Sequence, residues 1–165
     1  MKILLTNDDG IAGEGLRLLA EWSRTVGEIL IVAPKAEQSA MGQSIVLRRP
    51  FEVKRSDLFD DLGIESYSLD STPADCVRFA TDRFGPFDFV FSGMNRGLNL
   101  GFDIAYSGAC GAAFEVNYAG ILSSQKIHRR LLQQNGQPQL RLPVLLQKYF
   151  VILTVSPHIP HRPFR

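Results

Sequence analysis

Cysteine is scarce in this chain, and long hydrophobic runs are missing. Among 165 residues there are only two cysteines, Cys76 and Cys110, which are too few for a disulfide framework and do not form a CxxC pair. The longest apolar stretch, Tyr149–Val155, is far shorter than the roughly 18 residues that a membrane-spanning helix needs. We therefore expect a protein of a reducing compartment, located in the cytoplasm and without a membrane partner.

Excess charge of either sign is also missing. The formal net charge is +1 at pH 7, so the sequence predicts no nucleic-acid partner. Three well-known signatures are absent as well: the P-loop GxxxxGK[ST], the dinucleotide-binding GxGxxG after the first strand, and the GxSxG of serine hydrolases. These absences disfavour three large classes of enzyme.

The first 34 residues have the pattern of a βαβ unit. Residues 3–6 and 29–33 are short apolar runs, typical of strands that are covered on both faces, and residues 13–24 carry apolar positions at helical spacing. Parallel pairing with a right-handed crossover follows, so the fold class is α/β. The further elements we expect are a hairpin excursion over 44–55 and 65–69, a helix from Pro73 to Gly85-Pro86, a strand over 87–91, a long glycine-rich loop over 93–111, a helix over 108–118 and a strand over 149–155.

Two adjacent carboxylates, Asp8 and Asp9, follow the first predicted strand. Like charges side by side repel, and burying either of them costs free energy unless a cation is near. A bound metal ion explains the pair. A solvated turn leading into the next helix is the alternative, because Asp and Gly are common turn residues.

Polar residues follow two further predicted strands. Ser39 comes after the second strand and Asn95 after the third. Because the carboxyl ends of parallel strands share one edge of a sheet, we expect both to converge with the two aspartates. Carboxylate, hydroxyl and amide oxygens suit a hard divalent cation, Mg²⁺ or Mn²⁺, better than zinc.

The glycine-rich segment indicates a second feature of the site, an anion-binding backbone. Ser107 and Gly108 stand at the start of a predicted helix, where free N–H groups point toward an anion. A cation beside such a helix start predicts phosphomonoester hydrolysis by a metal-activated water. Cys110 is an alternative nucleophile near the same helix start, although no histidine is placed to assist it.

Four separated motifs resemble the stationary-phase survival protein SurE family. They are Leu5-Thr6-Asn7-Asp8-Asp9-Gly10, then Val32-Ala33-Pro34 with Gln38-Ser39, then Thr72-Pro73-Ala74-Asp75-Cys76-Val77, and finally Ser92 to Gly101 with Tyr106-Ser107-Gly108. The resemblance covers residues 1–124. It implies a Rossmann-like fold with a three-layer parallel sheet and helices on both faces, and a homodimer or homotetramer.

The resemblance also implies an activity and a set of site residues. Family members are metal-dependent 5′/3′-nucleotidases that hydrolyse nucleoside monophosphates, and some also act on short polyphosphate. Transferred to matching positions, the expected cation ligands are Asp8, Asp9, Ser39 and Asn95, of which the two aspartates are the expected catalytic residues. The residues expected around the phosphate are Asn7, Asn99, Ser107 and Gly108.

Two departures from the family pattern stand out. Ala109 replaces the usual Thr, which removes a hydroxyl near the expected phosphate, and the pattern is lost altogether from Gln125 onward. We therefore expect a catalytic domain over 1–124 and an atypical segment over 125–165. Our hypothesis is that this segment is encoded by a frame-shifted or otherwise altered end of a SurE gene. Such a change would leave one edge of the sheet uncovered. An undisturbed reading frame at the gene locus would overturn it.

Two other functions stay open at the level of sequence. Ala109 and the atypical segment favour a catalytically impaired protein that still binds metal and nucleotide. A haloacid-type phosphatase also begins with a strand and an aspartate, but it expects a spaced aspartate pair with a following threonine, which Asp8-Asp9-Gly10 lacks.

Overall fold

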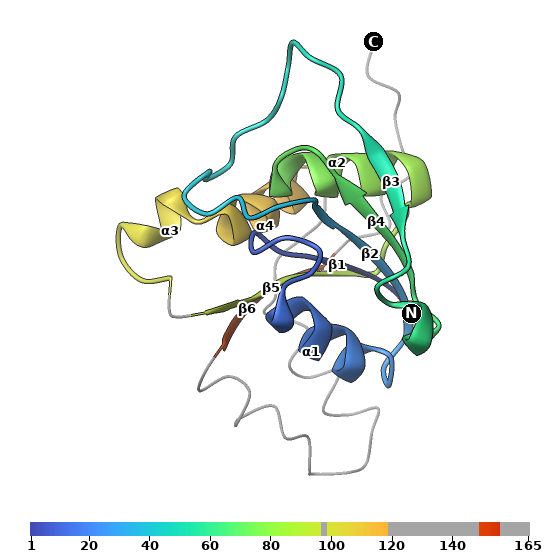
Figure 1. The fold of residues 1–165 in the computed structure, drawn as a ribbon. Coiled ribbons are helices and arrows are strands. Elements are labelled where there is room, and N and C mark those ends of the chain that lie inside the picture. The colour runs from blue at the N-terminus through green and yellow to red at the C-terminus, as the bar shows by residue number, and fades with distance from the viewer. Residues whose placement is uncertain (97–98, 119–148, 156–165) are drawn as a thin grey trace.

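The computed structural model describes residues 1–96, 99–118 and 149–155. A six-stranded sheet in the order β3-β4-β2-β1-β5-β6 forms the middle layer of this part of the chain (Figure 1). The elements in chain order are β1 (Lys2–Thr6), α1 (Glu14–Ser23), β2 (Glu28–Pro34), β3 (Val53–Ser56), the 3₁₀ helix η1 (Asp60–Leu62), β4 (Glu65–Leu69), α2 (Pro73–Phe84), β5 (Phe89–Arg96), α3 (Asp103–Tyr106), α4 (Gly108–Tyr118) and β6 (Tyr149–Val155).

Helices cover both faces of the sheet, which gives the three layers that we expected (Figure 1). Because side chains alternate along a strand, Ile3 and Leu5 of β1 face α1, whereas Leu4 faces α2 and α4. On the second face Val77 of α2 and Val116 of α4 complete the core. Both faces of the central strands are therefore buried, which is why these strands are short continuous apolar runs in the sequence.

The central strands β4, β2, β1 and β5 are parallel. The chain leaves β1 through α1 to reach β2 on one side, and it later returns through α2 to β5 on the other side of β1. The strand order therefore reverses between β1 and β5. In open α/β sheets, ligands bind in the crevice at the carboxyl ends of the strands that flank such a switch point.

The start of α2 follows the sequence prediction. Thr72 is the N-cap, Pro73 is the first helical residue, and the backbone N–H of Asp75 donates to Thr72 Oγ1 at 3.2 Å. The predicted exit at Gly85-Pro86 is also confirmed. None of the helices in the described ranges is long and apolar enough to cross a bilayer.

Three expectations about the elements need correction. The hairpin pairs only β3 with β4, and residues 44–52 form no strand; the backbone of Ser44 and Val46 instead bonds to the side chains of Thr72 and Asp75 at the start of α2. Residues 93–96 belong to β5, so the predicted long loop is shorter and contains α3. The sheet is mixed, since β3 and β6 are antiparallel to their neighbours.

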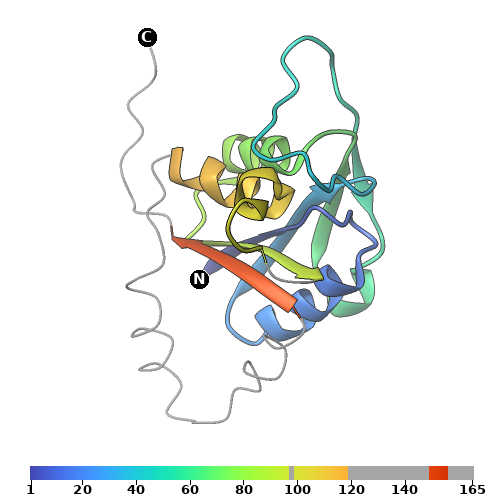
Figure 2. The same cartoon turned by 90° about the vertical axis from the view of Figure 1, so that its left-hand side faces the viewer.

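The sheet edge beside β5 is covered. Strand β6 runs antiparallel along β5, with Phe89 opposite Val155 and Arg96 opposite Tyr149 (Figure 2). The strand predicted over 149–155 is therefore confirmed, and it covers β5, so an uncovered edge does not lie at that strand. The other residues of the atypical segment, 125–148 and 156–165, lie outside the described residues.

We predict that Gly15→Ala destabilises the fold. A Cβ at Gly15 would overlap the carbonyl oxygen of Met94, so α1 would have to move away from β5. We expect a loss of about 2 kcal/mol, the scale of an overpacked core. The control is Glu21→Ala, which removes only an exposed ion pair with Arg17 on the same helix. Urea midpoints measured for both variants check this, and equal midpoints would contradict it.

Candidate active site

The turn after β1 is fixed by its own side chains. Asn7 is fully buried, and its Nδ2 donates to the carbonyl of Gly10 at 2.9 Å. Gly10 has a φ of +91°, which favours glycine, and its carbonyl also accepts from the N–H of Gly13. This turn places Asp8 and Asp9 at the carboxyl end of β1, where the strand order reverses.

The loop after β2 is bound to this turn and to α3. The N–H of Gln38 donates to the carbonyl of Asp8 at 2.7 Å, and the N–H of Gly42 donates to the carbonyl of Tyr106 at 2.7 Å. Ser39 lies between these two anchors and is exposed. Ser39 and the two aspartates therefore line the same cleft.

The start of α4 meets the Asp8 side chain directly. The N–H of Ala109 donates to Asp8 Oδ2 at 3.1 Å. Any Cβ at Gly108 would lie 2.8 Å from the Asp8 Cβ and 2.9 Å from the carbonyl oxygen of Gln38, so only glycine allows this approach. Ser107, just before the helix, accepts from the N–H of Cys110 at 3.2 Å.

Asn95 reaches the site through an irregularity of β5. The pairing of β5 with β6 shifts register between Ser92 and Asn95, as in a β-bulge. Bulges are common beside active sites because they change the direction of a side chain. Here the shift falls between the last residue paired with β1, Ser92, and the residue that lines the site.

A cleft of about 600 Å³ collects most of the expected site residues. Those that line it are Asp8, Asp9, Ser39, Asn95, Asn99 and Ser107. Asn7 and Gly108 do not line it, and they support it from behind through the contacts with Gly10 and Asp8 described above. The structure thus brings together segments that are far apart in sequence.

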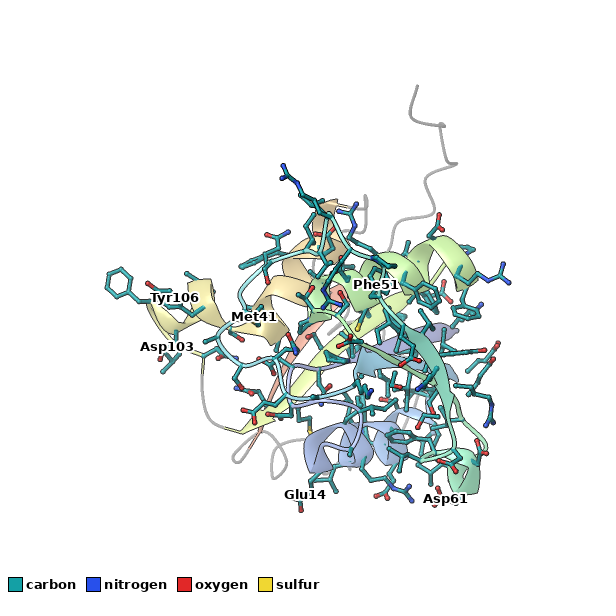
Figure 3. The ribbon with its side chains drawn as sticks, turned by 45° about the horizontal axis from the view of Figure 1, so that its top comes forward. Glu14, Met41, Phe51, Asp61, Asp103 and Tyr106 are labelled. Atoms are coloured by element: carbon teal, nitrogen blue, oxygen red, sulfur yellow. The ribbon has the colours of Figure 1, made fainter. Side chains whose placement is uncertain are left out.

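Four polar residues that sequence reasoning did not select also line the cleft. They are Glu14, Glu37, Asp103 and Tyr106. Asp103 and Tyr106 belong to the short helix α3 at the outer side of the molecule, near Met41 of the loop after β2 (Figure 3). The lining residues include no Lys, Arg or His within the described part of the chain. The cleft is therefore acidic.

The Asp8 carboxylate is the most unusual group of the cleft. It is only 4% exposed, and burial raises its pKa above the usual value. The N–H of Ala109 opposes this shift, while the neighbouring charge of Asp9 adds to it. Asp8 Oδ1 is buried without a hydrogen-bond partner among the described residues, and the same holds for Thr6 Oγ1 and Asn7 Oδ1.

Cys110 does not suit the alternative role of nucleophile. Burial raises the pKa of its thiol, and the charge of Asp8 acts in the same direction against a bond from Ser107. A thiol with a raised pKa stays protonated at neutral pH, whereas the thiolate is the reactive form. Cys110 therefore acts as a small packed side chain of α4.

Ala109 takes part in the site through its backbone. Its side chain is buried, its N–H donates to Asp8, and its carbonyl accepts from Ser92 Oγ at 2.8 Å. These bonds tie α4 to both strands at the switch point. They do not depend on the side chain, so the alanine at this position keeps both of them.

The fold and the cleft define a doubly wound, Rossmann-like α/β protein with an acidic site at its topological switch point. Comparison with known proteins gives the family. Residues 3–127 match the family model described as Survival protein SurE. The chain belongs to the SurE family.

Individual relatives agree with this assignment. The chain is 48% identical to the 5′-nucleotidase SurE of Clostridium botulinum over 117 residues, which are 70% of this chain and 46% of the relative. It is 46% identical to that of Thermococcus gammatolerans over 124 residues, or 74% of this chain and 46% of the relative. The chain spans about half the length of the curated relatives it matches.

A solved structure shows the same fold. The crystal structure of the SurE protein from Aquifex aeolicus superposes with a TM-score of 0.67 at 29% sequence identity. The match covers 84% of this chain and 62% of that one.

We predict that Asp8→Asn stabilises the protein in the presence of a chelator. The raised pKa means that ionised Asp8 costs stability, and this cost grows as pH rises from the ordinary pKa through the raised one. Asn keeps an acceptor for the Ala109 N–H and removes the charge. We expect a gain of about 1 kcal/mol at pH 7, the scale of one buried unpaired polar group.

Urea unfolding of both proteins at pH 4 and pH 7 checks this prediction. The difference in the free energy of unfolding between the two proteins isolates the effect of Asp8 from that of the other carboxylates. This difference should be larger at pH 7 than at pH 4. A difference that shrinks as pH rises, or a less stable Asp8→Asn at pH 7, would contradict it.

Proposed function

We propose that this chain hydrolyses phosphate monoesters, with nucleoside monophosphates as substrates and a divalent cation, Mg²⁺ or Mn²⁺, in the cleft. The observation that carries the proposal is the buried Asp8 carboxylate, with one oxygen unpaired at the wall of an acidic cleft. The name 5′-nucleotidase of the relatives supports the reaction and the substrate class.

The residues present fit a hard cation. An ionised carboxylate is costly to bury unless it is paired or binds a metal, and unpaired buried polar atoms call for an ion or water. Asp9, Ser39 and Asn95 line the same cleft and add carboxylate, hydroxyl and amide oxygens. Within the described ranges, no three His, Cys, Asp or Glu side chains are grouped so as to hold a metal.

The acidic lining gives a reason for cation dependence. A phosphate ester and the carboxylates of the cleft repel each other, and no Lys, Arg or His lines the described cleft to offset this. When bound, the cation supplies Lewis acidity toward a phosphoryl oxygen and lowers the pKa of water. Asp8 and Asp9 are thus the proposed catalytic residues, because they would bind the cation whose positive charge the reaction needs.

Donors for the phosphate come from the segments around α3 and α4. Ser107 Oγ accepts from the N–H of Cys110, and Ser107 lines the cleft, where its hydroxyl can turn toward a phosphate oxygen. Asn99 Nδ2 is buried and unpaired among the described residues, which leaves it available as a donor. Gly108 permits close approach at the helix start, and Asn7 supports the turn beneath. We assign all four to the phosphate site.

The proposal extends to the domain bounds, a second substrate, the location and the oligomeric state of the chain. We propose a catalytic unit of residues 1–124, action on short polyphosphate as well, and a cytoplasmic location. We also propose a homodimer or homotetramer, supported by the exposed apolar side chains of Leu100, Phe102 and Phe114. Light scattering of the whole chain measures the oligomeric state.

We predict metal-dependent release of phosphate from nucleoside 5′-monophosphates. Release should require Mg²⁺ or Mn²⁺ and stop with chelator. Asp8→Asn should lower kcat/KM by at least about 100-fold, because a direct ligand matters more than an outer partner. Phosphate release from several nucleotides, measured with each cation, checks this.

The matched control is Asp82→Asn, which removes an exposed carboxylate of α2 outside the cleft. It should keep the activity of the parent chain. Cation-independent release, or equal loss in both variants, would contradict the proposal. A folded chain that binds Mn²⁺ and releases no phosphate would instead be a metal- and nucleotide-binding protein.

A further inference from the structure

The Ser39 hydroxyl has a defined partner at the cleft. Its Oγ donates to Glu37 Oε1 at 2.7 Å, and both residues line the cleft. This length is normal for a charge-assisted bond between a hydroxyl and a carboxylate. It joins a proposed cation ligand to a carboxylate that the sequence did not single out.

The backbone of this segment is fixed beside Asp8. The N–H of Gln38, between the two residues, donates to the Asp8 carbonyl at 2.7 Å. On the other side, the Glu37 nitrogen lies 3.3 Å from where a Cβ of Gly10 would stand, so the segment packs against the turn after β1. Ala40 then has a φ of +60°, a left-handed conformation that turns the chain directly after Ser39.

A serine hydroxyl has one proton and two lone pairs. Next to a cation its lone pairs must face the ion, so its proton has to point toward an acceptor elsewhere. We propose that Glu37 is a positioning residue that accepts this proton and so presents the Ser39 oxygen to the cation. This inference rests on the proposed function, because it assumes the cation site of Asp8 and Asp9.

Two other roles for Glu37 give different results. If it acts only through its charge, Glu37→Gln and Glu37→Met should weaken cation binding equally. If it binds the cation directly, Glu37→Met should weaken binding even when Ser39 is absent. A positioning role needs an acceptor atom at this place and needs Ser39.

The test is the dissociation constant for Mn²⁺ alone, measured by calorimetry on the whole chain without nucleotide. Glu37→Met should weaken binding about 10-fold, as the loss of an outer partner does. Glu37→Gln keeps an acceptor oxygen and should stay within about threefold of the parent, because a charge exposed to solvent is screened. In the Ser39→Ala background, Glu37→Met should cause no further loss. Both side chains are exposed, so the variants should keep the melting temperature of the parent.

Equal loss in Glu37→Gln and Glu37→Met, or a further loss in the Ser39→Ala background, would overturn the positioning role. The positioning role would also be overturned if Glu37→Met binds Mn²⁺ with the affinity of the parent while Asp8→Asn abolishes Mn²⁺ binding. A parent chain that binds no Mn²⁺, or an Asp8→Asn variant with full affinity, would reject the cation site of the proposed function and this inference with it. The Asp8→Asn measurement therefore separates the two failures.

Discussion

Asp8 is bonded to two segments that are remote from it in sequence. Its carbonyl accepts from Gln38 after β2, and its carboxylate accepts from Ala109 at the start of α4. The cleft depends on this junction, because it holds three segments at one edge of the sheet. The same junction buries a charge, so the site costs stability unless a cation is bound. Asp8 therefore affects both the stability of the fold and the proposed function of the site.

Close backbone approach makes the junction possible. Gly108 lies against Asp8 and Gln38, and one turn later Gly111 lies against Gly42, so that a Cβ at either place would overlap its neighbour. Larger residues would push α4 away from the loop after β2. The cleft would then lose the alignment between the loop that carries Ser39 and the helix start.

The sequence by itself determined the central elements and several candidate residues of the site. Short apolar runs and the Thr72 cap depend on neighbouring residues only, so local pattern sufficed for β1, β2 and the start of α2. The pair Asp8-Asp9 was visible because two adjacent carboxylates after a buried strand are an unusual choice. Ser39 and Asn95 could be added from the rule that parallel strands share one edge.

Only the tertiary structure decided the rest of the site and the sheet. The register shift before Asn95 lies in the pairing of β5 with β6, a strand more than fifty residues away. Glu37 enters the cleft because the Gln38 N–H binds the Asp8 carbonyl, and Gly108 is required by the position of Asp8. Such contacts join distant segments, and no local pattern encodes them. The sequence determines which groups are available, and packing decides which of them meet.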